Sequence, residues 1–428
     1  MATTATRTLA DWLSYAETVH RVGIDLGLDR VRRVAERLGV LPPARENFVV
    51  AGTNGKGSTS VYLEALLRAT GRSVGTTLSP HLSRFNERIR VNGRPVDDRV
   101  ICEAFAEIET ARGDVTLTYF EFGILAALLV FKHSAVDVTV LEVGLGGRLD
   151  AVNIVDADVA TITSIGIDHV SYLGPDRESI GREKAGICRP GVPTVFGEAS
   201  MPASVVEVTQ RLASPLVRYG VDFDACATAD GWTFRGVRNA APIELHGLAA
   251  PSVALSNAAT ALQALLLHDR DAAIAPLVRA ASTARLPGRF EHFEFAGAVV
   301  IVDVAHNPHG ASFLADQLCA TRRGGRTIAV AGFLQDKDAQ GIVAALESQV
   351  DEWIFVETTG ARGQTAAIAA ARVQTGRPTV TAEAPLAATL GDLVGRLDLA
   401  RDRIVVLGCF DLAQRARALL TREVGDVD

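Results

Sequence analysis

The hydrophobic pattern of the first half of the chain alternates between short apolar runs and longer stretches of helical spacing. Four apolar runs predict buried strands, at residues 48–50, 73–78, 136–143 and 159–164. Apolar spacings of three and four predict helices at residues 9–21, 29–38, 60–70, 97–112, 119–133 and 177–187. Strands that alternate with helices in this way are typical of a doubly wound, mostly parallel sheet. The predicted fold class is therefore α/β.

The pattern then becomes less regular and restarts near residue 287. The polar stretch 84–98 predicts a surface hairpin or loop, and later segments predict strands at 194–196 and 216–219, a small antiparallel segment within 222–248 and a helix at 253–268. A Pro-Gly pair, Pro287-Gly288, interrupts the pattern. Beyond it, strands are predicted at 299–302, 327–331, 352–356 and 403–407, and helices at 309–319, 339–348, 384–397 and 412–420. We therefore predict a first domain at residues 1–286 and a smaller, Rossmann-like α/β domain at residues 287–428.

Charge and cysteine content narrow the class of protein. The chain has 428 residues and a net charge of -7, which argues against a nucleic-acid partner and against binding to an anionic membrane surface. Its five cysteines are scattered and never form a CxxC pair, as expected for reduced thiols in a cytosol. Residues 1–9 lack the apolar core of a signal peptide, and no run of about 18 apolar residues predicts a transmembrane helix. We expect a cytoplasmic protein without nucleic-acid or membrane partners.

A glycine-rich stretch, Ala51-Gly52-Thr53-Asn54-Gly55-Lys56-Gly57-Ser58-Thr59, lies between the first predicted strand and the helix at 60–70. Its glycines let the backbone N–H groups face inward, and the helix that follows adds the positive end of its dipole, so the stretch can bind phosphate. Lys56 adds a charge, and Ser58 or Thr59 adds a hydroxyl for a metal ion. The spacing is GxxGKG[ST] rather than GxxxxGK[ST], and a strand-to-helix turn that binds nothing is the alternative. We expect the phosphates to be held by Gly55, Lys56, Gly57 and Ser58.

Polar residues also follow three other predicted strands. Ser79 and the pair Asp168-His169 come shortly after an apolar run, and Glu142 lies at the end of one. Ligands bind beyond the carboxyl ends of parallel strands, so these residues and the glycine-rich loop predict one site for a nucleoside triphosphate and Mg²⁺. Taken singly, Ser79 before a proline is more often a turn residue and His169 a satisfied core residue. Glu142 could instead pair with Arg148.

Six segments of the chain follow the order of motifs in one enzyme family. They are residues 52–58, 79–82, 141–151, 168–169, 183–187 and 303–308. Together they resemble the folylpolyglutamate synthases of the Mur ligase superfamily, whose bacterial members are often bifunctional and act also as dihydrofolate synthases. Residues 25–28 and 118–123 are similar to the dihydropteroate-binding stretches of the bifunctional enzymes, so the resemblance runs from residue 25 to about residue 336. It departs at Gly408-Cys409-Phe410, where relatives commonly have Gly-Ser-Phe or Gly-Ser-Leu.

The resemblance implies an ATP-dependent ligase. ATP would phosphorylate the carboxylate of dihydropteroate or the γ-carboxylate of a tetrahydrofolate form, and the amine of L-glutamate would attack the acyl phosphate to give an amide, ADP and phosphate. The implied cofactors are ATP, Mg²⁺ at two sites and, as a further cation, K⁺. A monomer is expected because no long apolar surface helix stands out. The alternatives are a monofunctional folylpolyglutamate synthase, a Mur-type ligase for UDP-sugar peptides, and a nucleotide-binding regulator without turnover.

The resemblance also implies roles for single residues. Lys56, Lys184 and His306 would be catalytic, with His306 near the glutamate or the transferred phosphoryl group. Lys184 would take up CO₂ and bind the second Mg²⁺ as a carbamate, although a solvated helix lysine is the plain alternative. The metal ligands would then be Ser79, Glu142, His169 and carbamylated Lys184. His169 is the least typical of these ligands, because imidazole is an unusual ligand for Mg²⁺.

The remaining implied contacts are with ATP and the pterin. Besides the loop from Gly55 to Ser58, ATP would contact Asn257, Arg289 and Asp303 from the far side of a cleft. Dihydropteroate would contact Asp25, Leu26, Gly27, Leu28, Tyr119, Phe120, Glu121, Phe122, Gly147, Arg148, Leu149, Asp150 and Ala151. The first domain would therefore bind ATP and the pterin, and the second would contribute contacts to ATP and glutamate.

Overall fold

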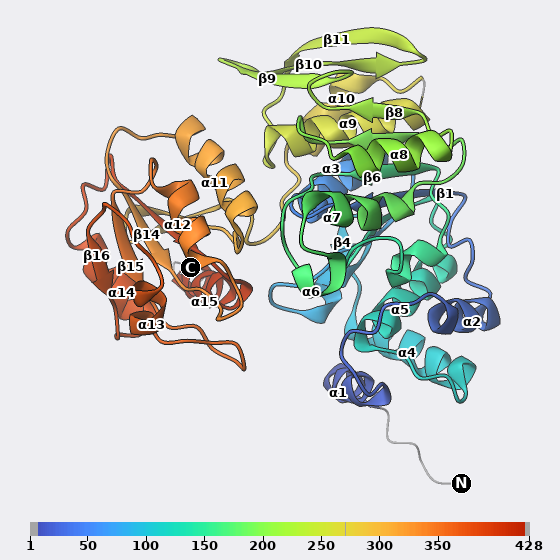
Figure 1. The fold of residues 1–428 in the computed structure, drawn as a ribbon, viewed down its shortest axis with the longest axis horizontal. Coiled ribbons are helices and arrows are strands. Elements are labelled where there is room, and N and C mark those ends of the chain that lie inside the picture. Colours follow the sequence, from blue (N-terminus) through green and yellow to red (C-terminus); the bar gives the residue numbers. More distant parts are fainter. Residues whose placement is uncertain (1–6, 270, 424–428) are drawn as a thin grey trace. The chain divides into compact units, whose positions relative to one another are not determined.

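The α/β fold class predicted from the sequence is confirmed by a computed structural model, which describes residues 7–269 and 271–423 (Figure 1). The chain divides into two compact units, residues 1–285 and 286–428. In the described part of the chain, all five cysteines are free thiols, and no helix has the length and apolarity needed to cross a membrane.

The first unit is organised around an eight-stranded sheet with the order β4-β3-β2-β5-β1-β6-β7-β8. Its strands are β1 (Glu46–Ala51), β2 (Val74–Thr77), β3 (Ile89–Val91), β4 (Arg94–Pro95), β5 (Val138–Glu142), β6 (Val159–Ile162), β7 (Thr194–Phe196) and β8 (Leu216–Arg218). All neighbours from β2 to β8 pair in parallel, and only β3 and β4 extend the sheet with antiparallel pairs. The polar stretch expected to be a hairpin or loop therefore forms this edge.

Helices cover both faces of this sheet because neighbouring residues of its strands point to opposite sides. Val49 and Ala51 of β1 join one core cluster, and Phe48 and Val50 join the other. The first cluster includes α1 (Leu9–Val19), α2 (Asp29–Leu38), α4 (Asp98–Arg112), α5 (Tyr119–His133), α7 (Arg177–Lys184) and α8 (Ala203–Arg211). The second includes α3 (Lys56–Ala69), α9 (Leu255–His268) and α10 (Ile274–Ala281). The site edge is thus held by a packed core on each face.

Short elements complete the first unit. They are η1 (Phe85–Arg88), η2 (Ala151–Ile154), α6 (Val170–Leu173) and η3 (Ala185–Ile187). A separate antiparallel sheet of β9 (Asp224–Thr228), β10 (Gly231–Arg238) and β11 (Ala241–Leu248) confirms the antiparallel segment predicted within 222–248.

The second unit has a six-stranded sheet with the order β12-β13-β17-β14-β15-β16. Its strands are β12 (Glu291–Phe295), β13 (Ala298–Val302), β14 (Thr327–Ala331), β15 (Glu352–Phe355), β16 (Thr379–Thr381) and β17 (Arg403–Leu407). Its helices are α11 (Pro308–Ala320), α12 (Ala339–Leu346), α13 (Ala366–Ala371), α14 (Leu386–Val394) and α15 (Phe410–Glu423). Only β12 pairs in antiparallel fashion, so the alternation predicted for this part of the chain gives a mostly parallel sheet.

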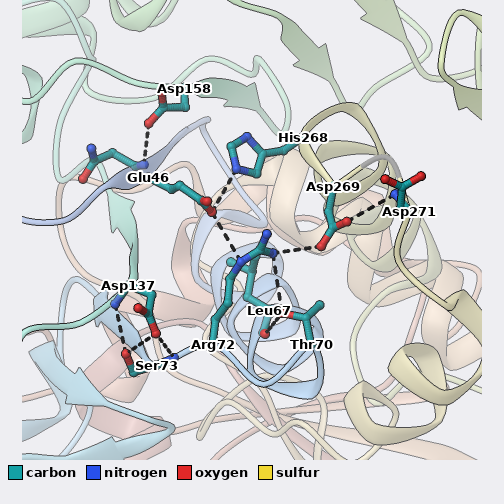
Figure 2. Close-up of polar contacts among 11 residues, drawn as sticks. Glu46, Leu67, Thr70, Arg72, Ser73, Asp137, Asp158, His268, Asp269 and Asp271 are labelled. Atoms are coloured by element: carbon teal, nitrogen blue, oxygen red, sulfur yellow. Dashed lines mark hydrogen bonds and ion pairs between the residues drawn. The ribbon is translucent and has the colours of Figure 1, made fainter.

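An ion-pair network ties the amino end of β1 to the ends of two helices (Figure 2). Glu46 lies 2.9 Å from His268 Nε2 and 3.5 Å from Arg72 Nε, and Arg72 also pairs with Asp269 at 3.0 Å. Next to it, Ser73 Oγ donates to Asp137 at 2.6 Å. Structural contacts therefore occupy the amino ends of these strands. The loops that carry the candidate site lie at the opposite, carboxyl ends.

The register of the strands brings those loops together at the carboxyl ends of the strands. Val50 pairs with Glu142 and Ala51 with Ile162, so β5 and β6 end on either side of the glycine-rich loop. Thr77, two residues before Ser79, pairs with Leu141. The residues that follow β1, β2, β5 and β6 consequently lie along one edge, as the sequence pattern predicts.

Candidate active site

The glycine-rich loop is shaped by Gly55, which has a φ of +80° and precedes the first residue of α3. The predicted helix at 60–70 starts earlier than expected, at Lys56, so the lysine and Ser58 lie in its first turn. A Cβ atom on Gly55 would come within 2.5 Å of Asn257 Oδ1. Glycine is therefore required here both by the left-handed backbone and by the contact with Asn257.

Asn257 lies where the resemblance did not place it. It belongs to α9 of the first unit and packs against Gly55, so the expectation that it reaches ATP from the far side of a cleft is wrong. An amide side chain against the loop remains compatible with a nucleotide contact, but from the same unit as the loop.

The loop is tied to the segment after β6 by several hydrogen bonds. Thr53 N–H donates to Ser164 O at 2.8 Å, Asn54 N–H donates to Ser164 Oγ at 3.1 Å, and Gly166 N–H donates to Thr53 Oγ1 at 3.0 Å. These bonds fix the start of the segment that ends in Asp168 and His169. His169 is exposed, with a φ of +52°, so the alternative of a satisfied core histidine is wrong.

Two lysine side chains converge on one carbonyl of the loop. Lys56 Nζ and Lys184 Nζ each donate to Gly52 O at 2.9 Å. Lys184 is only 4% exposed, so the alternative of a solvated helix lysine is wrong. Burial and, after it, the positive charge of Lys56 lower the pKa of Lys184 to about 7, while Asp168 and Asp150 act in the opposite direction. A large share of Lys184 is therefore a neutral amine near pH 7.

Glu142 and Ser79 form a second polar group at the edge. Glu142 is buried, and its Oε2 accepts the Ser79 N–H at 2.8 Å. Ser79 Oγ is buried without a hydrogen-bond partner among the described residues, which is costly unless a ligand supplies one. Arg148 pairs with Glu183 at 2.8 Å, so the predicted alternative pairing of Glu142 with Arg148 is wrong.

A metal ion fits this arrangement in its chemistry. Hydroxyl and carboxylate oxygens are the ligands that Mg²⁺ prefers, and an orphaned buried hydroxyl beside a carboxylate offers both. No group of three or more His, Cys, Asp or Glu side chains that could hold a metal occurs among the residues that the structure describes. An ion at this edge would therefore need ligands of other types, such as the Ser79 hydroxyl, phosphate oxygens and water.

The loop that follows β5 is organised from within by Asp150. Its two carboxylate oxygens accept N–H groups of Leu145 at 2.8 Å and Val152 at 2.9 Å. Burial raises the pKa of Asp150 to about 6, although these donors and Lys56 act in the opposite direction. Gly147 packs against the Glu183 and Lys184 backbone, where a Cβ would come within 2.9 Å of either carbonyl oxygen. Of the five residues expected at the pterin in this loop, Gly147, Asp150 and Ala151 are buried, Leu149 is partly buried and Arg148 is exposed.

Arg30 joins the two segments that the resemblance assigns to the pterin. It lies 2.7 Å from Asp25 Oδ2 and 3.2 Å from Glu121 Oε1. Leu26, Gly27, Leu28, Tyr119 and Phe120 are partly buried beside this link. Phe122 is fully buried in the core, so it supports the segment from behind. The sequence pattern did not indicate Arg30, because a single arginine on a polar helix carries no distinguishing signal.

The second unit carries its own polar group at the ends of β13 and β17. Asp303 is buried and accepts N–H groups of Phe290 and Ala305, both at 2.8 Å. Burial raises the pKa of Asp303, and Arg289 beside it opposes the rise. Arg289 and His306 lie 5.5 and 5.8 Å from the Phe410 ring. All three residues expected in this unit, Arg289, Asp303 and His306, therefore lie in one cluster.

Comparison with known proteins gives a consistent family for both units. Residues 50–230 match the Mur ligase middle domain, and residues 288–410 match the Mur ligase glutamate ligase domain. The chain is 49% identical over 358 residues to the dihydrofolate synthase/folylpolyglutamate synthase of Escherichia coli (strain K12), which covers 84% of each protein.

Solved structures agree in fold. A structure of E. coli FolC in complex with DHPP and ADP superposes with a TM-score of 0.91 at 44% identity, over 99% of this chain and 100% of that one. A bifunctional folylpolyglutamate synthase/dihydrofolate synthase with Mn, AMPPNP and L-glutamate bound superposes with a TM-score of 0.88 at 43% identity, over 98% and 100%. The chain therefore belongs to the dihydrofolate synthase/folylpolyglutamate synthase family of the Mur ligase superfamily, a family of ATP-dependent glutamate ligases.

Proposed function

We propose that this enzyme ligates L-glutamate to dihydropteroate and to the γ-carboxylate of tetrahydrofolate forms, with ATP converted to ADP and phosphate through an acyl phosphate. The observation that carries the proposal is the convergence of Lys56 and Lys184 on Gly52 O, within a loop suited to phosphate. Two related structures support the same set of substrates: one contains DHPP and ADP, and the other contains Mn, AMPPNP and L-glutamate.

The glycine-rich loop and Lys56 would bind and orient the phosphates of ATP. Backbone N–H groups at the start of α3 face the loop, and the Lys56 ammonium, now bonded to loop carbonyls, can turn to a phosphate oxygen. Asn257 would hold the loop from α9. Positioning and charge stabilisation of this kind provide most of the catalysis in phosphoryl transfer.

Ser79, Glu142, His169 and carbamylated Lys184 are the residues that we propose to hold two Mg²⁺ ions. When bound, Mg²⁺ supplies positive charge that offsets repulsion between the phosphates and the substrate carboxylate. The Glu142 carboxylate is buried and is oriented by the Ser79 N–H, which supports its proposed role as a metal ligand. K⁺ is proposed as an additional cation, which replacement of K⁺ by Na⁺ in the assay tests.

Lys184 would form its carbamate by direct reaction with CO₂. The lone pair of the neutral amine forms the N–C bond, the electrons of one C=O π bond move to oxygen, and one N–H proton leaves to solvent, so a neutral amine becomes an anionic carbamate. The pKa of about 7 supports this step because only the neutral amine reacts. Lys184→Ala should lose activity that short carboxylic acids restore, and ¹³C-bicarbonate should give the wild type a carbamate NMR signal. An active, unimpaired variant would rule the carbamate out.

Arg289, Asp303 and His306 are the proposed contributions of the second unit to ATP and glutamate. Their common cluster, with Asp303 held by two backbone N–H groups, supports a shared role. We propose that the enzyme is a cytoplasmic monomer, for which light scattering should give about 45.3 kDa.

A comparison of acceptors tests the proposed function. Purified enzyme with ATP and Mg²⁺ should release ADP only when both L-glutamate and dihydropteroate, or a tetrahydrofolate form, are present. ADP release with a UDP-muramyl peptide and none with any pteroate would contradict the substrate assignment. Turnover with tetrahydrofolate alone would leave a monofunctional folylpolyglutamate synthase.

A further inference from the structure

The polar segment after Ser79 turns back toward the candidate site. The sequence pattern predicts a surface hairpin or loop here, yet Arg88, at the end of η1, is only partly exposed. Its carbonyl oxygen accepts the Leu78 N–H at 3.1 Å, so the backbone of Arg88 is fixed beside the residue that precedes Ser79.

The Arg88 side chain is held on three sides. Its Nε–H donates to His81 Nδ1 at 2.7 Å, and its guanidinium carbon lies 5.6 Å from the ring centres of both Phe85 and Tyr119. Arginine can only donate, so His81 must accept at Nδ1 and carry its proton on Nε2. The guanidinium is therefore preorganised before any ligand binds.

The charge of Arg88 has no carboxylate bonded to it within the described chain. Glu87 is used by three loop N–H groups, those of Leu82, Ser83 and Arg84, at 2.7, 2.9 and 2.8 Å. Glu142, whose charge acts on Arg88, is fixed by Ser79 N–H. Among the described residues, no hydrogen bond or ion pair engages the two terminal nitrogens of Arg88, Nη1 and Nη2. A guanidinium that has lost part of its hydration and has no carboxylate bonded to it can bind an anionic ligand.

We propose that Arg88 binds the carboxylate of the acceptor acid through Nη1 and Nη2 and presents it to ATP. The inference rests on the proposed function and adds to it the group that recognises the reacting acid. A guanidinium matches a carboxylate with two parallel hydrogen bonds. The place is also suitable, because Tyr119 belongs to the segment assigned to the pterin while Leu78 and Glu142 lie at the edge assigned to the phosphates.

A second oxyanion, the γ-phosphate of ATP, could meet the same guanidinium. The test therefore measures three dissociation constants for wild type, Arg88→Gln and Arg88→Lys: those of dihydropteroate, of its carboxamide and, in separate titrations, of AMPPNP. The acid and the amide are titrated with AMPPNP and Mg²⁺ present. The amide has the same pterin and ring but lacks the negative charge.

Arg88→Gln should weaken binding of the acid about 10- to 100-fold, the loss expected for charge-assisted hydrogen bonds. Binding of the amide and of AMPPNP should change about twofold or less, so the preference for acid over amide should disappear. Arg88→Lys should keep part of the preference because it keeps the charge and loses the planar fork. Arg84→Gln is the matched control: Arg84 lies on the same loop but is exposed and paired with Asp98 at 3.1 Å.

The possible results distinguish failure of the role proposed for Arg88 from failure of the proposed substrate. A preference for acid over amide that survives in Arg88→Gln overturns the inference, and so does a loss of AMPPNP binding as large as the loss of acid binding. A general loss of structure in Arg88→Gln would lower the binding of acid and amide equally. In that case Arg88→Lys, which retains the cation, provides the test: a preference for acid over amide in this variant supports the role of Arg88, and the absence of a preference contradicts it. A wild-type enzyme that binds neither acid nor amide overturns the substrate assignment itself.

Discussion

At the scale of residues, Lys184 shows how burial sets the state of one amine. The side chain lies under the glycine-rich loop and shares Gly52 O with Lys56, so its charge is opposed both by loss of water and by a like charge. The pattern of the sequence could place Lys184 near a motif but not inside the protein, since burial depends on how η3 and the loop after β5 pack.

The depressed pKa of Lys184 should appear as a pH dependence of stability. Between about 7 and the ordinary lysine value of 10.5 the unfolded chain holds a proton that the folded chain lacks, so the free energy of unfolding rises with pH by up to about 1.4 kcal/mol per unit. Urea unfolding in CO₂-free buffer between pH 7 and 9 should show this rise in the wild type and a flatter profile in Lys184→Met. Equal slopes would mean that the amine is charged in the folded state.

Lys56 is expected to act mainly in catalysis. Lys56→Ala should lower kcat at least about 100-fold, the usual effect of removing one preorganised electrostatic donor. Steady-state ADP release measures the change, and Lys132→Ala, which removes an exposed lysine of α5, is the control. Activity near that of the control would refute the role of Lys56.

At the scale of elements, most of the buried strands and long helices were predictable, and several exposed or weakly periodic elements were not. The predicted apolar runs correspond to β1, β5, β6, β14 and β17, because buried parallel strands are apolar on both faces. In contrast, α13 is almost entirely alanine and β16 is fully exposed, so neither carries a periodic hydrophobic signal. The helix predicted at 29–38 corresponds to α2, which begins at Asp29 and is followed by Gly39 in the left-handed conformation.

The same limit applies to the candidate site. Motif order indicated the loop from Gly55 to Ser58, Glu142 and Lys184, because each follows an apolar strand or matches a family segment. Motif order could not indicate Arg30 or Arg88, because their importance depends on partners that are distant in the sequence. Arg30 bonds Glu121, which is 91 residues away, and Arg88 lies over the ring of Tyr119 on a different helix.

Gly55 packs against Asn257 of α9. Comparing alanine substitutions at Gly55 and Gly71 separates the effect of backbone strain from the effect of this contact. Gly55→Ala and Gly71→Ala both place alanine at positive φ, +80° and +90°, and each should cost about 1–2 kcal/mol of stability. Only the Cβ at Gly55 meets Asn257, so only Gly55→Ala should also weaken AMPPNP binding, by about tenfold or more. Thermal unfolding and titration measure the two effects. Equal nucleotide affinities in both variants would show that the contact with Asn257 is unimportant for ATP.

At the scale of the whole molecule, the family match extends over both units, and each unit carries a polar cluster at the carboxyl ends of its strands. In the first unit the cluster combines two lysines, a buried carboxylate and an orphaned hydroxyl; in the second it combines a buried carboxylate, an arginine and a histidine. Each of these clusters contains charged groups of the kind that a transfer of phosphate to a carboxylate requires.

The transfer of oxygen from the acid to phosphate tests this account most directly. Dihydropteroate labelled with ¹⁸O in both carboxylate oxygens is incubated with enzyme, ATP, Mg²⁺ and L-glutamate, and the phosphate released is examined by mass spectrometry. An acyl phosphate intermediate predicts one ¹⁸O atom in each phosphate and one in the amide product. Unlabelled phosphate, released together with the amide, would contradict activation of the acid by ATP.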